Sequence, residues 1–485
     1  MIPRANLRAL FLLGLLALPV RQAVAHPRLL KSDPAADARV AAPHAVALTF
    51  NEKLSPALSR VTLQDAKGAP VPLEALKAAS GDPKTLVAAI AGRLAPGAYV
   101  VKWQAAGDDG HPVRGQFGFE VIASVPGPDG SPNVLEAGIS LPSLASISSV
   151  ISAVFATRTA SAQGESAGTD TEFSVESPVY VIVRAAQAFA LIALIGVLTM
   201  HNLILPRAGL SATGGDPSAI ERAQRAVVRW VTPLLVLLVV VTLGRLAAQY
   251  AALFGTNDVP SPTSVFSLLT ASLWGWGWLM AFVAVCVGLV AARRLRSEHR
   301  DAWALLALVA VLLAASMAMS GHAAAASAFA MALQTLHVLG AGGWIGSLGV
   351  LILVAIPAVM ATVEADRHAI IGAFVRAFSP AALACAGLVA VTGFAAAWRT
   401  IGLTSALWQS RYGQILLLKL ALLSVAAVTG LYNWRSVVPA LGTEPATRRL
   451  RRSAAVELGA AAFVIAVTAV LVATPTPAEA APSAP

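Results

Sequence analysis

The stretch AYVVKWQAAGDDGHPVRGQFGFEV, residues 98–121, contains two strand-like runs that are separated by a polar turn. Both runs are rich in the β-branched and aromatic residues that strands favour. Between them, Asp109 and His111 flank Gly110. Glycine lets the backbone turn so that the carboxylate and the imidazole can converge on one point. The stretch therefore predicts two strands of a β domain with a candidate polar site at their junction.

Similar short runs recur through residues 26–125. They include AVALTF (45–50), SRVTLQDA (59–66) and TLVAAIA (85–91), and turn formers separate them. About seven strands in roughly 100 residues predict a small β sandwich or barrel. The following residues 126–177 are rich in Ser, Gly, Pro and Ala, which is typical of a linker.

The N-terminus has the pattern of a secretory signal over residues 1–25. Arginines precede an apolar run at 9–20, and the small residues Ala23 and Ala25 place the cleavage after Ala25. Cleavage there makes His26 the mature N-terminus. That residue would then carry a free amine and an imidazole together.

The rest of the chain has the composition of a polytopic membrane protein. Of its 485 residues, 57% are hydrophobic and 12% are charged. Each long apolar segment can cross about 30 Å of hydrocarbon as a helix. We expect eight spans within residues 178–474, followed by a disordered tail at 475–485. The spans are 178–205, 226–252, 264–292, 302–320, 328–360, 378–402, 411–433 and 453–474.

The charge pattern predicts an orientation and excludes several classes of protein. Arginines gather in alternate loops between the spans, which places those loops in the cytoplasm and the β domain outside. The net charge of +10 therefore reports topology, and we expect a lipid bilayer and no nucleic acid as partner. Cys286 and Cys385 lie inside apolar segments, so no disulfide framework is expected. The chain has no Walker-type loop for ATP hydrolysis, and we expect no enzymatic activity.

The candidate ligands of the β domain form a nitrogen and oxygen set. The amine and imidazole of His26, the Asp109 carboxylate and the His111 imidazole suit Cu(II) in tetragonal geometry. The amine and Nδ1 of His26 can close a six-membered chelate ring, which requires the residue to be N-terminal. After the initiator, the first methionine is Met200, so the β domain offers no thioether for Cu(I).

Two histidines stand out in the membrane half because ionisable groups at membrane depth are costly and usually functional. His322 and His337 lie toward the outer face in the predicted topology, at the end of the fourth span and early in the fifth. Met317 and Met319 precede His322, and Met319 shares a helix face with it if the helix continues that far. These residues can form a copper path. The alternatives are hydrogen bonding between helices for the histidines and lipid or core packing for the methionines.

A second pair lies near the inner end of the first span. Met200 and His201 are adjacent there and are candidates for an exit site. Three intramembrane charges, Arg245, Lys419 and Glu457, have no partners that the sequence reveals.

The β domain resembles the CopC copper-resistance family. The similarity is carried by AHPRLLKSDPAADARV (25–40), VALTFNEKLSPALSRVTLQDAKG (46–68) and residues 94–121. The resemblance implies a periplasmic, Ig-like β sandwich that holds Cu(II) near its N-terminus. Carried over to this sequence, it places the ligands at His26, Asp109 and His111, with the acid Glu52 of FNEKL close to them.

The membrane half is similar to the CopD family. Its matching motifs include SGHAAA (320–325), LHVLGAGGWIGSL (336–348) and RYGQILLLKLALL (411–423). Such fusions are associated with copper uptake, so the resemblance implies a multi-pass protein of the bacterial inner membrane that contributes to copper homeostasis and resistance. Copper ions, and other periplasmic copper carriers, are the partners it implies.

Two other functions remain open from the sequence. Histidines on adjacent helices can ligate haem, so a membrane electron-transfer protein that acts on copper is one alternative. A tethered periplasmic copper buffer or sensor that transports nothing is the other.

The first prediction concerns the N-terminal amine. One alanine added before His26 of the mature chain should lower its Cu(II) affinity by roughly a hundredfold or more, because the chelate ring is lost while every side chain stays. Affinity is measured by competitive Cu(II) titration, and the control carries its extra alanine after Pro485. Equal affinity in both proteins would contradict a terminal-amine ligand.

Overall fold

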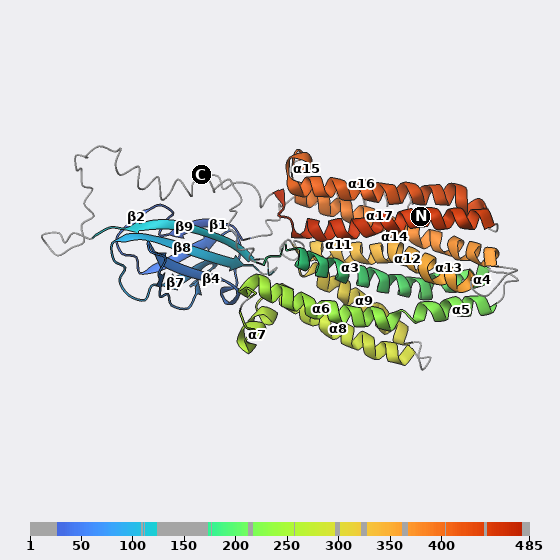
Figure 1. The fold of residues 1–485 in the computed structure, drawn as a ribbon, viewed down its shortest axis with the longest axis horizontal. Coiled ribbons are helices and arrows are strands. Elements are labelled where there is room, and N and C mark those ends of the chain that lie inside the picture. Colours follow the sequence, from blue (N-terminus) through green and yellow to red (C-terminus); the bar gives the residue numbers. More distant parts are fainter. Residues whose placement is uncertain are drawn as a thin grey trace, which may run out of the picture.

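The computed structural model consists of a β sandwich and a bundle of long helices (Figure 1). The sandwich lies at one end of the bundle, next to the first residues of α3 and the last residues of α6. The structure describes residues 27–107, 110, 112–123, 173–175, 177–211, 217–256, 258–295, 301–321, 327–360, 367–402, 404–440 and 444–477.

Two antiparallel-rich sheets form the sandwich. One sheet has four strands in the order β1-β3-β7-β6, and the other has five in the order β2-β9-β8-β4-β5. The short strands at the sheet edges are additional to the longer ones that the sequence predicts. The strands are β1 Leu29–Asp33, β2 Arg39–Val40, β3 Ala45–Phe50, β4 Arg60–Asp65, β5 Pro70–Val71, β6 Lys77–Ala79, β7 Asp82–Ala89, β8 Gly97–Ala106 and β9 Pro112–Val121.

The core lies between the two sheets and follows from alternation along the strands. In β3, Val46, Leu48 and Phe50 are buried while the residues between them are only partly covered. The Phe50 ring meets Trp103 of β8 edge to face, with centroids 5.3 Å apart. Alternate side chains of a strand point to opposite faces, so one face of each sheet fills this core.

The longest strand pair places the polar turn at one end of the sandwich. The register of β8 and β9 runs from Gly97 opposite Val121 to Ala106 opposite Pro112. Pairing thus continues up to the two residues that bracket residues 107–111 in the sequence. This is the end of the sandwich that faces the helices (Figure 1).

The helical half is described by its elements in chain order. Several spans contain a π-helical turn, labelled η3 to η6. The elements are α3 Pro178–Thr199, η3 Met200–Ile204, α4 Leu205–Ser211, α5 Pro217–Val228, α6 Val231–Phe254, α7 Pro262–Thr270, α8 Leu273–Leu295, α9 Asp301–Ala318, α11 Ala328–Ala341, η4 Gly342–Gly346, α12 Ser347–Val350, η5 Leu351–Ala355, α13 Ile356–Met360, α14 Arg367–Ile401, α15 Ala406–Gln409, α16 Arg411–Tyr432, η6 Asn433–Val437 and α17 Glu444–Ala473, with short 3-10 turns η1 Pro56–Leu58 and η7 Val438–Ala440.

Eight helices among the described residues are long and apolar enough to cross a membrane. This confirms the predicted fold class of an N-terminal β sandwich followed by an all-α membrane domain. Some predicted boundaries differ. The predicted third span divides into α7 and α8, because Ser272 interrupts the helix and its hydroxyl accepts from Gly275 N of the next turn at 3.2 Å. The sixth helix begins at Arg367, eleven residues before the predicted 378, because its first turns pack Ile371 and Phe374 into the bundle core.

Close backbone contact joins α3 to the π turn η4 of the fifth span. A Cβ atom added to Gly346 would meet the Ile192 carbonyl oxygen and Gly196 Cα, and one added to Gly196 would meet Gly346. Small residues at both positions let the two backbones approach, which is how helices gain van der Waals contact when lipid surrounds them. Gly346 of the motif GAGGWIGSLG is therefore a close helix-packing position.

The second prediction tests this contact. Gly346→Ala should destabilise the protein by about 1–3 kcal/mol, since the added methyl group forces α3 and η4 apart. Gly387→Ala on α14 is the matched control, because a Cβ there meets nothing within 4 Å. The control should gain up to about 1 kcal/mol from helix propensity. Thermal unfolding in detergent measures both, and equal stability of the two variants would contradict the packing role.

Candidate metal site and its docking on the helices

Residues next to the predicted ligands converge at the helix-facing end of the sandwich. Gly107 forms an isolated bridge with Leu54. A Cβ on Gly107 would lie 2.9 Å from Glu52 Oε1 and 3.6 Å from Pro27 Cγ. The residue that follows His26, the acid Glu52 and the start of the polar turn therefore meet at one point.

Two hydrogen bonds hold Arg28, the residue after Pro27, beside Asn51. The Arg28 N–H donates to Asn51 Oδ1 at 2.5 Å, and the Asn51 N–H donates to the Arg28 carbonyl at 3.1 Å. These bonds hold the beginning of the mature chain beside the FNEKL segment. The predicted outer acid Glu52 thus lies close to Pro27, the residue that follows His26 in the sequence.

The ligands themselves lie outside the described residues. This applies to His26, Asp109 and His111. Within the described ranges, no three His, Cys, Asp or Glu side chains converge as a metal cluster. The ligand set therefore stays a prediction, which the placement of Pro27, Glu52 and Gly107 supports.

Gly110 lies directly against the helical bundle. Its carbonyl accepts a hydrogen bond of 2.6 Å from Gln249 Nε2 of α6, and Gln249 is buried. Its φ of +75° is a conformation that L side chains rarely adopt, and a Cβ there would lie 2.9 Å from Trp274 Cβ of α8. Glycine is required here by both backbone conformation and space. The turn that carries two predicted ligands is therefore docked on α6 and α8.

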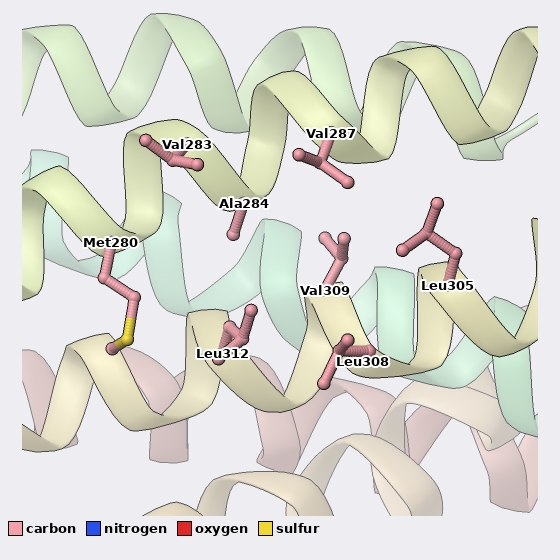
Figure 2. A pocket seen from close by; sticks show the side chains of 8 residues that line it. All are labelled: Met280, Val283, Ala284, Val287, Leu305, Leu308, Val309 and Leu312. Carbon is pink, nitrogen blue, oxygen red and sulfur yellow. The ribbon is translucent and has the colours of Figure 1, made fainter.

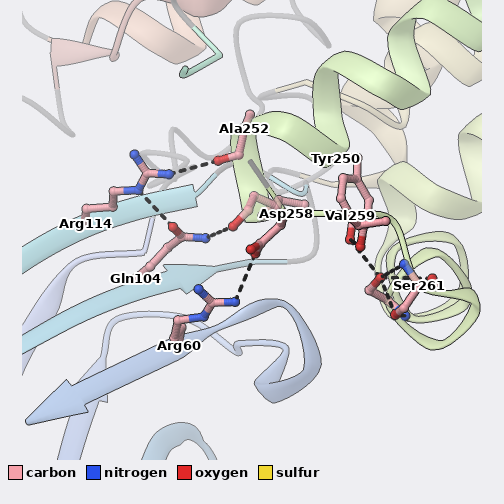
Figure 3. A network of polar contacts seen from close by, with 10 residues as sticks. Arg60, Gln104, Arg114, Tyr250, Ala252, Asp258, Val259 and Ser261 are labelled. Atoms are coloured by element: carbon pink, nitrogen blue, oxygen red, sulfur yellow. Dashed lines mark hydrogen bonds and ion pairs between the residues drawn. The ribbon is translucent and has the colours of Figure 1, made fainter. Parts of the chain in front are cut away.

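The end of α6 forms a second contact with the sandwich (Figure 3). Helix ends leave their last carbonyl groups without helical partners. The Gln104 side chain donates to the Leu253 carbonyl at 2.7 Å, and Arg114 Nη2 donates to the Ala252 carbonyl at 3.1 Å. Gln104 and Arg114 are paired across β8 and β9, and Arg114 Nε donates to Gln104 Oε1 at 2.8 Å. The two strands thus satisfy the orphan carbonyls with one linked pair of side chains.

Apolar packing and an ion pair complete the interface. Leu58 and Ala106 of the sandwich are buried with Tyr250, Leu253 and Trp274 of the helices in one cluster. At its edge, Arg60 Nη2 lies 3.5 Å from Asp258 Oδ2, and both side chains are largely exposed (Figure 3). An exposed pair of this kind contributes at most about 1 kcal/mol, so the cluster and the buried hydrogen bonds hold the interface.

Below Gly110, polar side chains connect α3 and α6. Tyr180 Oη donates to Gln249 Oε1 at 2.5 Å, and Arg245 Nη1 donates to Gln187 Oε1 at 2.8 Å. Of these polar residues, only Arg245 was singled out from the sequence, and Tyr180, Gln187 and Gln249 were not. The spacing of polar residues by three and four within apolar segments is the signal that could have found them.

His337 of α11 is hydrogen-bonded to α14. Its Nδ1 lies 3.0 Å from Thr392 Oγ1, and that hydroxyl also lies 2.6 Å from the Leu388 carbonyl. Because the hydroxyl proton goes to the carbonyl, Nδ1 is the donor of the imidazole bond, and Nε2 keeps its lone pair. A Cβ on Gly393 would lie 3.1 Å from His337 Cε1, so the glycine allows α14 to approach. The hydrogen bond between helices that the sequence offered as an alternative is thus present between His337 and Thr392. It leaves Nε2 able to bind a metal.

The helix of the fourth span ends before Met319. Helix α9 ends at Ala318, where the Ser320 N–H bonds three residues back to Met317 at 3.4 Å and the hydroxyl of Ser320 bonds to Ser316 O. The condition that the helix continues through Met319 to His322 is therefore not met. His322 lies outside the described residues.

These two methionine side chains pack against apolar neighbours. Met317 lies against the bundle core, and Met319 lies against Gly277 of α8.

The two residues near the inner end of the first span have different neighbours. Met200 has 0% of its surface exposed and belongs to the hydrophobic core of the bundle. His201 stacks on Trp303 of α9, with ring centroids 3.6 Å apart and an interplanar angle of 12°. Met200 therefore packs among core side chains, and His201 packs on an aromatic ring.

Partners are found for two of the three intramembrane charges. Arg245 bonds to Gln187 as described, and Asn433 Nδ2 of η6 donates to Glu457 Oε1 of α17 at 2.6 Å. Ser453 Oγ lies 2.5 Å from Asn433 Oδ1, which orients the amide toward Glu457. Lys419 of α16 lies within electrostatic range of His337.

A groove between α8 and α9 offers no metal site (Figure 2). Its volume is about 130 Å³, and Figure 2 shows only hydrocarbon side chains and one thioether, that of Met280, on its walls. The other lining residues are Val283, Ala284, Val287, Leu305, Leu308, Val309 and Leu312. Such a surface suits a lipid chain better than a polar ligand.

Three family models match successive parts of the chain. A model described as CopC domain matches residues 29–122. A model described as Copper resistance protein D-like, N-terminal domain, matches residues 174–332, and one described as Copper resistance protein D matches residues 372–471.

Curated relatives resemble the β sandwich. Copper resistance protein C of Escherichia coli is 39% identical over 105 residues, which cover 20% of this chain and 83% of that protein. Copper resistance protein C of Pseudomonas syringae pv. tomato is 35% identical over 123 residues, or 24% of this chain and 96% of that protein. Protein YobA of Escherichia coli K12 is 35% identical over 98 residues, or 20% and 79%.

Solved structures match the same region. CopC from Methylosinus trichosporium OB3b is 37% identical and matches 20% of this chain and 93% of its own, with a TM-score of 0.19. PcoC, described as a methionine rich copper resistance protein from Escherichia coli, is 36% identical over 20% of this chain and 100% of its own, also with a TM-score of 0.19. The sandwich of the present chain, by contrast, contains no methionine.

The third prediction concerns the docked turn. Gly110→Ala should loosen the sandwich from the helices, because the added methyl group meets Trp274 and Gln249. Hydrogen exchange near the ends of β8, β9 and α6 should speed up by about tenfold or more, which corresponds to a loss of about 1.4 kcal/mol.

Gly68→Ala is the control for this prediction. Gly68 also has a positive φ, of +82°, but a Cβ there meets nothing within 4 Å. It should leave exchange at the interface unchanged. Equal exchange at the interface in both variants would show that Gly110 does not hold the sandwich in place.

Proposed function

Because the chain belongs to the copper resistance family that combines a CopC domain with CopD domains, we propose that it captures Cu(II) in its sandwich and passes copper to its membrane helices for uptake. His26, Asp109 and His111 are the proposed Cu(II) ligands, and Glu52 is the acid beside them. The ligands supply nitrogen and oxygen donors, which suit Cu(II). Copper is the cargo, and no ATP is required.

The docking of Gly110 is the observation that carries this proposal. Two proposed ligands flank Gly110 in the sequence, and its carbonyl is bonded to the buried Gln249 between the helices. A metal released from this turn enters the bundle without first diffusing through solvent. A tethered buffer needs no such contact, so the geometry favours delivery over storage.

We place the protein in the inner membrane with the sandwich in the periplasm. Helices α4, α5 and α13 lie at the end of the bundle away from the sandwich (Figure 1). That end carries Arg225 of α5 and Arg293 and Arg294 in the last turn of α8. Positively charged ends remain in the cytoplasm, so the sandwich faces the opposite side.

Within the bundle, His337 and His322 are the proposed residues of the copper path. Among the described residues, the unprotonated Nε2 of His337 is the atom proposed to bind copper. The hydrogen bond to Thr392 fixes this tautomer of the ring. Methionines Met317 and Met319 and the pair Met200 and His201 have less support, because each packs in an apolar or aromatic environment. Other periplasmic copper carriers are the proposed donors to the sandwich.

The experiment that tests transport compares cells with and without the gene at limiting copper. Cytoplasmic copper should be higher in cells that make the protein. If copper rises only in the periplasm, the protein is a buffer, and an equal cytoplasmic level at equal expression rejects uptake.

The fourth prediction concerns the membrane path. His337→Ala should reduce copper accumulation by roughly tenfold or more, because it removes the donor Nε2, and His322→Ala should do the same. Thr392→Val should reduce it less, since it frees the imidazole tautomer without removing the ring. Copper is measured in whole cells, together with the amount of protein in the membrane fraction.

The control variant for this prediction is His368→Ala. His368 lies in the first turn of α14, where the structure places it in a helix and not in the predicted loop. It should accumulate copper like the parent, and all of these variants should still bind Cu(II) in the sandwich. Parental accumulation by His337→Ala and His322→Ala would place the path elsewhere.

A further inference from the structure

Two arginines on the neighbouring helices α3 and α6 are buried in the half of the bundle nearer the sandwich. Arg184 of α3 has 6% of its surface exposed, and Arg245 of α6 has 7%. The two charges are among the most costly groups to bury, unless an opposite charge or several hydrogen bonds compensate them.

The hydrogen bonds between α3 and α6 show why the arginines are neighbours. Tyr180, Arg184 and Gln187 follow one face of α3, with spacings of four and three residues. Tyr180 bonds to Gln249, and Gln187 bonds to Arg245, one turn along α6. Arg184 therefore lies between these two cross-links and faces the same side of α6 as Arg245.

Both guanidinium groups keep N–H groups that no atom of the described residues accepts, and Arg184 keeps more of them than Arg245, which donates to Gln187. Both Nη atoms of Arg184 and the Nε of Arg245 are buried without a hydrogen-bond partner. The Arg184 guanidinium lies 4.9 Å above the Tyr180 ring, and that of Arg245 lies 5.7 Å from the Trp274 ring. Aromatic faces stabilise a cation, but they accept none of these N–H groups along the guanidinium edges.

The compensating negative charge does not come from a described side chain. The ion pairs found among the described residues join Arg39 to Glu120 and Arg60 to Asp258, and neither includes these arginines. The buried acid Glu457 lies on α17 and accepts a hydrogen bond from Asn433, so it is engaged on other helices. Two positive charges and unused donors in one buried place are what a small anion binds.

We propose that Arg184 and Arg245 form a binding site for a small monovalent anion, a halide or a small carboxylate, between α3 and α6. Gln187 and Tyr180 orient the arginines, and Gln249 links the site to Gly110 above it. The evidence for the anion site comes from helical residues and does not depend on copper binding. If copper passes from the turn to the helices as proposed above, the anion lowers the positive potential that a copper ion meets there.

Thermal unfolding of the purified full-length protein in detergent tests the site. Chloride replaces the bulky anion isethionate at constant ionic strength, so that screening stays the same. Binding to the folded state should raise Tm with the logarithm of the anion concentration above Kd, by roughly 3 °C at a hundredfold excess over Kd. Acetate is titrated in the same way and separates a carboxylate from a halide, and stabilisation by either anion supports the site.

Variants connect any stabilisation to the two arginines. Arg184→Gln and Arg245→Gln should each abolish the dependence of Tm on the anion. Arg294→Gln, at an exposed position in the last turn of α8, removes the same charge and should keep it. Anion dependence that persists in both Arg184→Gln and Arg245→Gln places the anion elsewhere and overturns the proposal.

A second measurement covers variants that fail to fold. The parent should broaden the chloride NMR line, and Arg184→Lys, which keeps the charge but loses the guanidinium fork, should need at least tenfold more chloride to reach half of the effect. A parent without broadening and without a change of Tm in either anion overturns the site. Because neither readout uses copper, this result leaves the transport proposal untouched.

Discussion

The carbonyl groups at the end of α6 that have no helical partner determine how the two halves of the protein join. Helix α6 ends at Phe254, and the carbonyls of Ala252 and Leu253 accept from side chains of the sandwich instead of from the next helical turn. Arg114 adds a positive charge at the negative end of the helix dipole, an effect of about 0.3–1 kcal/mol at exposed positions. Because the two side chains are neighbours on β8 and β9, the sandwich meets the bundle with its strand ends.

This attachment has a direct consequence for the candidate metal site. The strand ends that hold α6 are also the ends that carry the turn at Gly110, so the turn comes to rest on Gln249 and Trp274. Gln249 in turn belongs to the polar contacts between α3 and α6. One continuous set of hydrogen bonds thus extends from the sandwich to buried groups of the helices. A change at the turn can act on the helices through these bonds without a large movement of either half.

The helices hold their polar residues in separate places, and each place suits different chemistry. Arginines gather beneath the turn, an imidazole with a free Nε2 lies between α11 and α14, and a carboxylate lies with Asn433 near η6. On the proposed route, copper that leaves the turn at Gly110 meets the arginines of α3 and α6 near Gln249. The positive charge of the arginines opposes a cation at this point of the proposed route.

Local sequence patterns predicted the architecture because they report burial directly. Alternation over residues 45–50 predicted β3, and long apolar runs predicted eight spans, since period and length follow from the geometry of strands and helices. The same patterns predicted boundaries less well. The break at Ser272 and the end of α9 at Ala318 depend on hydrogen bonds of single turns, which hydropathy does not report.

For the candidate site too, the sequence determined some features and the tertiary structure determined others. The residue types and the position of His26 after the signal predicted a Cu(II) ligand set, because donor chemistry belongs to the side chains themselves. Only the tertiary structure decided that Gly110 would meet Gln249, 139 positions away, and that His337 would bond to Thr392, 55 positions away. Such pairs depend on how helices and sheets pack, and a polar residue in an apolar segment has the same local pattern whichever partner it finds.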